Sequence, residues 1–281
     1  MRVFIAVVFS VALALVIYQV TYGPVDGAGD SGEGVWGSKT ATVNWCEADY
    51  VVTPYIAEIG NSLSSLSIVF NGVFGLIMHY RTVELPYILA FVAIVIVGFG
   101  SFAFHATLRR DMQILDEVPM LWGNGVFIFI LVSIEDHWNV RRRGEAIAIA
   151  VATAIMTFLT VVYDKENQDI FLLSYGSGVV YIAARSKRLH RTFESVRPLA
   201  LLELSLALYL GGFVFWLLDR NFCTSVRPLF FHALWHLGAG TGTFIAVIFW
   251  VFIRQEVLHG VAPTLRGATP MTVWVEPASK T

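Results

Sequence analysis

The sequence predicts an all-α integral membrane protein: a bundle of seven transmembrane helices preceded by an N-terminal signal peptide or signal anchor. Of its 281 residues 56% are hydrophobic and 14% are charged, whereas soluble domains average about 45–50% apolar and about 25% charged residues. The mean hydropathy is +0.67. The net charge is −2 and the basic clusters lie in short loops, which argues against nucleic acid as a partner.

The chain opens with a leader, residues 1–22. Arg2 precedes an apolar run over 3–20, the pattern of a signal peptide or of an uncleaved signal anchor. We favour cleavage, because residues 21–35 are rich in glycine and aspartate like a mature N-terminus. In either case residues 23–54 form a lumenal segment on the non-cytoplasmic side.

Seven further segments are each close to the ~20 residues that a membrane-spanning helix needs. The first is the least apolar, since it carries four serines and two asparagines, and we expect its polar face to point into the bundle. The links are short, so consecutive helices should be antiparallel neighbours in a catalytic bundle over 55–253. The expected spans are Tyr55–Tyr80, Pro86–His105, Glu117–Ile134, Glu145–Tyr163, Ile170–Arg185, Pro198–Leu218 and Leu229–Ile253.

The bias of lysine and arginine between loops predicts the orientation. Arg141–Arg143 lies between the third and fourth spans, and five basic residues lie between the fifth and sixth. Both loops are cytoplasmic if the first of the seven spans enters from outside. Arg109 and Arg110 then lie on the outer side, but the two basic loops outnumber them. Residues 254–281 become a cytoplasmic tail.

Polar residues from distant parts of the sequence converge on the outer end of this bundle. Residues 44–58 precede the first span, residues 101–116 link the second and third, and residues 232–236 begin the seventh. Cys46 and Cys223 fall in the same layer and compartment, so we expect a disulfide between them. Two free thiols are the alternative.

Three histidines in this layer have the pattern of a catalytic zinc site. His232 and His236 are four residues apart and share a helix face, and His105 lies in the same layer. Three neutral imidazoles leave a fourth position open, as in catalytic rather than structural zinc sites. Haem ligation, or two unrelated interfacial histidines, would give the same spacing.

Ser101 and Asp116 could supply the remaining chemistry of such a site. Zinc lowers the pKa of a bound water to about 7 and polarises a carbonyl. Asp116 could take the proton of that water and pass it to a leaving group, and Ser101 could donate to the oxyanion. This set suits metal-assisted hydrolysis of an amide or ester in a lipid. Interfacial polar residues without a catalytic role are the alternative.

A second cluster is acidic and precedes the first span. Glu47, Asp49 and Glu58 supply three carboxylates, and Asn44 and backbone carbonyls add neutral oxygens. An all-oxygen set suits calcium. An ordinary acidic loop, with Glu58 favourable at a helix start, explains the same residues and is the preferred interpretation on spacing alone.

Together these motifs resemble the alkaline ceramidase family, most closely its alkaline ceramidase 3 (phytoceramidase) type. The resemblance covers about residues 37–253. The matching residues are Trp45-Cys46-Glu47 with Glu58 and Asn61, Gly100-Ser101 with Phe104-His105, Leu115-Asp116-Glu117 with Pro119, Phe215-Trp216 with Asp219 and Cys223, and Phe231-His232 with Trp235-His236.

The resemblance implies a seven-helix amidohydrolase of the endoplasmic reticulum or Golgi. It would cleave ceramide, dihydroceramide or phytoceramide to a sphingoid base and a free fatty acid. The implied residues are zinc ligands His105, His232 and His236, catalytic Ser101 and Asp116, calcium ligands Asn44, Trp45 (through its carbonyl), Glu47, Asp49 and Glu58, and the pair Cys46 and Cys223.

The sequence departs from the family pattern at two positions of the acidic cluster. The family has Asp where Asn44 stands and Asn where Asp49 stands, which moves the charge without changing its sum. Progestin and adiponectin receptors share the wider layout, so a heptahelical receptor or other lipid hydrolase is the first alternative. A membrane transporter or haem protein is the second. No obligate protein partner is expected.

Overall fold

The computed structural model describes residues 2–22, 33–136, 142–164, 168–193 and 196–278. Arg141 of the basic loop between the third and fourth expected spans and residues 23–32 of the lumenal segment lie outside these ranges. The helices are α1 (Arg2–Tyr22), α2 (Ile59–His79), α3 (Leu85–Thr107), α4 (Arg110–Ser133), α5 (Arg143–Tyr163), α6 (Asp169–Phe193), α7 (Val196–Asn221), α8 (Cys223–Val226) and α9 (Phe231–His259), and the strands are β1 (Thr264–Arg266) and β2 (Trp274–Glu276).

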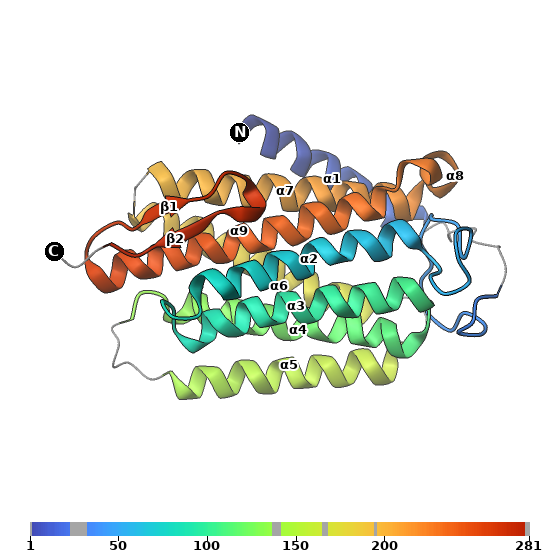
Figure 1. Ribbon diagram of the computed structural model, residues 1–281, viewed down its shortest axis with the longest axis horizontal. Helices are drawn as coiled ribbons and strands as arrows, with labels where there is room; N and C mark the ends of the chain where they lie inside the picture. Colours follow the sequence, from blue (N-terminus) through green and yellow to red (C-terminus); the bar gives the residue numbers. More distant parts are fainter. Residues whose placement is uncertain (1, 23–32, 137–141, 165–167, 194–195, 279–281) are drawn as a thin grey trace.

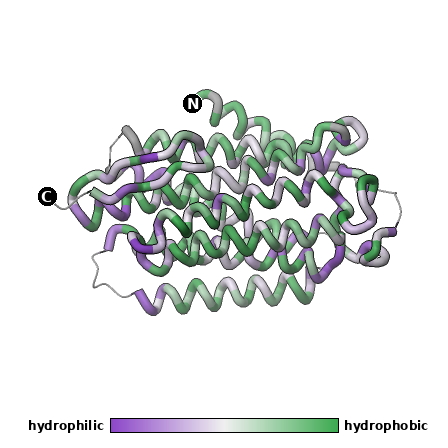
Figure 2. Tube along the Cα trace, viewed as in Figure 1, coloured by the Kyte–Doolittle hydropathy of each residue, from purple (hydrophilic) through white to green (hydrophobic). Residues whose placement is uncertain are grey.

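The long helices lie side by side, and their order follows the predicted spans (Figure 1). Six described helices are long and apolar enough to cross a membrane: α2, α3, α4, α5, α7 and α9. Figure 2 shows hydrophobic residues along their length and hydrophilic residues gathered toward the ends. The predicted all-α membrane fold is confirmed.

The fifth expected span coincides with α6, which is not among those six helices. Glycine, serine and tyrosine interrupt its apolar run, and arginine and lysine fill its last turns. Seven crossings therefore stay a prediction.

The leader forms α1, which lies obliquely beside α7 (Figure 1). Ala12 is buried against a cluster that includes Leu217 of α7. Tyr18 stacks on Phe222 with ring centroids 5.1 Å apart. This packing suits a retained anchor, the alternative to the cleavage that the sequence favoured, and cleavage stays a prediction.

Close backbone contact fixes α9 against α7. A Cβ added at Gly238 would lie 2.8 Å from the carbonyl oxygen of Leu208, and one at Gly242 would lie 2.9 Å from that of Ser205. Small residues four apart allow membrane helices to approach in this way. The first turns of α9, which carry two of the candidate site residues, are thereby held beside α7.

The C-terminal residues are more ordered than a free tail. The last helix continues to His259, beyond the expected end of the seventh span at Ile253. The chain then returns as the antiparallel pair β1–β2. Val275 is buried, and its N–H donates to Nε2 of His79 at 3.1 Å. This hairpin packs at the end of the bundle opposite α8 (Figure 1).

Candidate metal centre

The structure brings His105 of α3 together with His232 and His236 of α9. Their ring centroids are 4.7 Å (His232 to His236), 4.9 Å (His105 to His236) and 5.0 Å (His105 to His232) apart. Their ligand atoms lie within 4.8 Å of one another. All three side chains are buried. Because zinc–nitrogen bonds are about 2.0–2.1 Å long, small side-chain movements would bring all three onto one ion.

Helix ends position these histidines. The last turn of α3 holds His105, and the helix ends at Leu108 with φ of 50°, the left-handed region. Carbonyls in such a last turn lack helical partners. Here the carbonyl of His105 accepts from the N–H of Glu58 at 3.0 Å, and that of Ala106 from Ala57 at 2.9 Å. The start of α2 is thus docked against His105.

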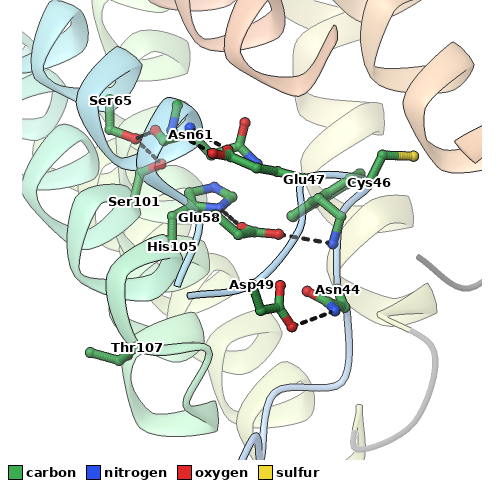
Figure 3. Close-up of polar contacts among 12 residues, drawn as sticks. Asn44, Cys46, Glu47, Asp49, Glu58, Asn61, Ser65, Ser101, His105 and Thr107 are labelled. Carbon is green, nitrogen blue, oxygen red and sulfur yellow. Dashed lines mark hydrogen bonds and ion pairs between the residues drawn. The ribbon is translucent and has the colours of Figure 1, made fainter. Parts of the chain in front are cut away.

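This docking places a carboxylate on the first histidine. Nδ1 of His105 lies 2.5 Å from Oε2 of Glu58, whose other oxygen accepts from the Trp45 N–H at 3.2 Å. Figure 3 shows Glu58 pointing toward His105. A carboxylate on one imidazole nitrogen leaves the other nitrogen to a metal and fixes the ring, as in many metal sites.

The second histidine, His232, faces an aromatic wall. Its ring stacks on Trp45 at 3.7 Å between centroids. Trp216 of α7 packs next to Trp45, with 5.5 Å between the two ring centroids. Nδ1 of His232 is buried without a hydrogen-bond partner among the described residues. A bound ion would satisfy such a nitrogen, so the donor set fits a metal.

Ser101 lies beside the third histidine, His236. Its Oγ is 3.4 Å from Nε2 of His236 and 2.9 Å from Oγ of Ser65. The Ser101 side chain is buried. The hydroxyl is therefore in reach of any group held by the triad.

Asp116 lies where α4 packs against α3. A Cβ at Gly100 would be 2.2 Å from the carbonyl oxygen of Leu115 and 3.0 Å from Cα of Asp116. Pro119 stands inside α4 and has no N–H, so that carbonyl has no helical partner. Glycine beside this freed carbonyl lets α4 approach α3 at Gly100, the residue before Ser101.

Two tyrosines join this polar layer without having been predicted. The hydroxyl groups of Tyr175 on α6 and Tyr209 on α7 are 2.9 Å apart. Tyr175 is close enough to Asp116 for the two side chains to interact electrostatically. Lone tyrosines in apolar helices carry no sequence signal, because their ordinary role is packing.

A buried polar network next to the triad was also missed. Glu117 accepts hydrogen bonds from Gln113, at 2.6 Å, and from Gln168. Arg110 lies 3.6 Å from its other oxygen. Gln168 in turn accepts from Arg220 at 3.1 Å. The five groups come from α4, α7 and the residue before α6, so only the folded bundle reveals the network.

The structure brings some residues of the acidic cluster into contact with one another. Asn44 donates to Asp49 at 3.1 Å (Figure 3). Glu47 accepts from the N–H groups of Gly60, at 2.7 Å, and Asn61, at 2.9 Å, which is favourable at the start of α2. Among the described residues, the histidine triad is the group whose ligand atoms meet as a metal site.

The electrostatics of this loop nevertheless favour a cation. Burial, assisted by the charge of Glu58, raises the pKa of Asp49 to about 6. Burial also raises the pKa of Glu47. Oδ1 of Asn44 is buried without a hydrogen-bond partner among the described residues. Acceptor oxygens in excess of donors are what a calcium ion satisfies.

The predicted disulfide joins Cys46 to Cys223. It ties the loop before α2 to α8. The N–H of Cys46 also donates to Oδ2 of Asp219 at 3.0 Å. The neighbouring Trp45 ring is thereby held against His232.

Comparison with known proteins assigns the family. The sequence model of the Ceramidase family matches residues 37–264. The chain belongs to the ceramidase family. It is 33% identical over 244 residues to "Alkaline ceramidase 3" of Mus musculus, covering 81% of this chain and 89% of that protein.

Two further relatives are somewhat less identical in sequence. "Alkaline ceramidase YPC1" of Saccharomyces cerevisiae is 31% identical over 258 residues, which are 80% of each chain. "Alkaline ceramidase" of Arabidopsis thaliana is 27% identical over 228 residues, covering 79% of this chain and 87% of that one. The resemblance read from the motifs is confirmed, and the chain is a hydrolase of the ceramidase family.

Proposed function

We propose that this ceramidase-family hydrolase cleaves the N-acyl amide of ceramide, dihydroceramide or phytoceramide to a sphingoid base and a free fatty acid. The observation that carries the proposal is the buried triad of His105, His232 and His236 beside Ser101. The triad lies inside a bundle of apolar helices, so the substrate would come from the bilayer.

The triad's three imidazoles suit zinc, and the unpartnered nitrogen of His232 supports an ion at this point. When bound, zinc would supply a Lewis acid for the amide carbonyl and lower the pKa of a water. Glu58 would hold His105 in the orientation that this requires.

The chain's own groups carry the proton and the developing charge. Asp116 accepts a proton from the attacking water while the oxygen of that water bonds to the carbonyl carbon. The hydroxyl of Ser101 donates to the resulting oxyanion. Asp116 then returns the proton to the amide nitrogen as the carbon–nitrogen bond breaks. An amine and a carboxylic acid leave, and Asp116 is again a carboxylate.

Calcium is the second ion we propose. Its ligands would be Asn44, the Trp45 carbonyl, Glu47, Asp49 and Glu58. The raised pKa of Asp49 and the unpartnered Oδ1 of Asn44 support it. The ion would brace the start of α2, and through it the contact between Glu58 and His105.

We propose seven crossings, with α6 counted among them. The segment after the leader would face the lumen of the endoplasmic reticulum or Golgi, and the C-terminus would face the cytoplasm. The disulfide at the α8 end supports a lumenal place for that end. Lys187 and Arg188, near the end of α6, support a cytoplasmic place for the other.

Release of free sphingoid base from a panel of ceramides tests the function. Purified protein in detergent, at mildly alkaline pH, should release base, and the His236→Ala variant should not. Release by wild type and variant alike would contradict the triad's role. No release from any ceramide by protein that binds zinc would favour the receptor-like alternative. No observation among the described residues specifically favours that alternative, and none favours the transporter or haem alternative.

A further inference from the structure

The polar face of α2 contacts both His236 and Ser101. The sequence showed this helix to be rich in serine and asparagine, and the structure places three of these residues, Asn61, Ser64 and Ser65, at positions i, i+3 and i+4. Residues so spaced share one helix face. That face looks toward His236 on α9 and Ser101 on α3.

Ser64 contacts the nitrogen of His236 that faces away from Ser101. Its Oγ is 2.8 Å from Nδ1 of His236, and its own hydroxyl donates to the carbonyl of Asn61 at 3.0 Å. While the Ser64 proton is donated to Asn61, Ser64 accepts from Nδ1 of His236. In that arrangement Nδ1 carries the hydrogen of the neutral ring, and the lone pair is left on Nε2.

Ser65 makes the matching contact with Ser101. Its Oγ lies 2.9 Å from Oγ of Ser101 and 2.8 Å from the carbonyl of Asn61. It is also 3.4 Å from Nδ1 of His236, but Ser64, at 2.8 Å, is the nearer partner of that nitrogen. The hydroxyl groups of Ser65 and Ser101 are buried. While the Ser65 proton is donated to Asn61, Ser65 accepts from Ser101. When Ser65 turns this proton from Asn61 to Oγ of Ser101, the proton of Ser101 is released to donate to an oxygen in the site, and Ser64 still donates to the Asn61 carbonyl.

We propose that Ser64 and Ser65 are positioning residues with separate tasks. Ser64 holds His236 in the tautomer that offers Nε2 to the metal. Ser65 orients the hydroxyl of Ser101 toward the substrate oxygen. The inference deepens the proposed function and rests on it, since it assumes that the triad binds zinc and that Ser101 meets the oxyanion.

Zinc affinity and turnover separate the two tasks. Zinc affinity is measured by competition with a chromophoric chelator on the purified full chain, and the visible spectrum of the cobalt-substituted protein reports ligand geometry. For Ser64→Ala we expect zinc affinity to fall by about 10–100-fold and the cobalt spectrum to change. For Ser65→Ala we expect both to stay as in wild type while kcat falls at least about 10-fold at little-changed KM.

Ser67→Ala is the matched control. Ser67 is on the same helix, and its Oγ donates to the carbonyl of Ser64 at 2.7 Å without contacting the triad. It should behave as wild type in every assay. Wild-type zinc affinity in Ser64→Ala, or an equal loss in Ser67→Ala, would overturn the role of Ser64. Wild-type kcat in Ser65→Ala, or a fall in its zinc affinity, would overturn the role of Ser65.

Failure of the proposed function is distinguishable from failure of this inference. If wild-type protein binds zinc but hydrolyses no ceramide, the substrate is wrong, while the zinc affinities still decide the role of Ser64.

Discussion

Glu58 links the acidic loop before α2 to the histidine triad. The sequence placed it with the calcium ligands, and the structure places its carboxylate on His105. The contact depends on the docking of Glu58 and Ala57 onto the last carbonyls of α3. The separation of residues 58 and 105 in the sequence does not predict this contact. The four-residue spacing of His232 and His236 is local, so it predicts directly that the two side chains share a helix face.

At the same scale, Asp116→Asn tests the proton carrier. The amide keeps the size of the side chain but cannot accept a proton, so turnover should fall by about 10²–10⁴-fold while zinc stays bound. Activity and metal content of the purified variant are the measurements. Asp111→Asn, an exposed acid on the same helix, is the control and should keep full activity. Comparable activity in the two variants would remove Asp116 from the mechanism.

The elements of the fold were predicted better than their contacts. Apolar runs of bilayer length predicted α2 to α7 and α9 in order, because a membrane helix satisfies its own backbone within one segment. The hairpin β1–β2 was not predicted, since its strands are short and Val275 is buried only by packing on other elements. The approach of α3 to α4 was also hidden, although Gly100 and Pro119 were both among the family motifs.

That approach can be tested at Gly100. Gly100→Ala adds a Cβ that would lie 2.2 Å from a backbone oxygen of α4, so α4 must shift at Asp116. We expect a loss of about 1–3 kcal/mol in unfolding free energy and a larger fractional loss of activity than of zinc. Thermal unfolding, activity and metal content are measured together. Gly123→Ala, whose Cβ would meet nothing nearer than 3.7 Å, should be tolerated, and equal behaviour of both variants would refute the packing argument.

The molecule as a whole couples a loop at the α8 end to the buried triad. Three links make this coupling: the disulfide of Cys46, the stacking of Trp45 on His232, and the contact of Glu58 with His105. All three depend on the path of residues 44–58, which contains the proposed calcium ligands. Ordering of this loop should therefore stabilise the whole bundle.

The pH dependence of calcium protection follows from the raised pKa of Asp49, about 6 against 3.8 in the unfolded chain. The folded state binds this proton more tightly, so without a cation stability falls as pH rises through this range. Calcium offsets the cost only when the carboxylate is charged. It should raise the unfolding temperature more at about pH 8 than at about pH 5. The Asp49→Asn variant should lose part of this difference, because Glu47 and Glu58 also have raised pKa values and supply the rest. An equal shift at both pH values in wild type would count against calcium at this loop.

The central claim is that one zinc ion on His105, His232 and His236 is required for amide cleavage. It is tested most directly by stripping the purified protein with a chelator and titrating zinc back, while bound metal and released sphingoid base are measured in the same samples. We predict that activity returns in proportion to bound zinc and is complete at one ion per chain. Full activity in the stripped protein, or bound zinc without any return of base release, would contradict the account.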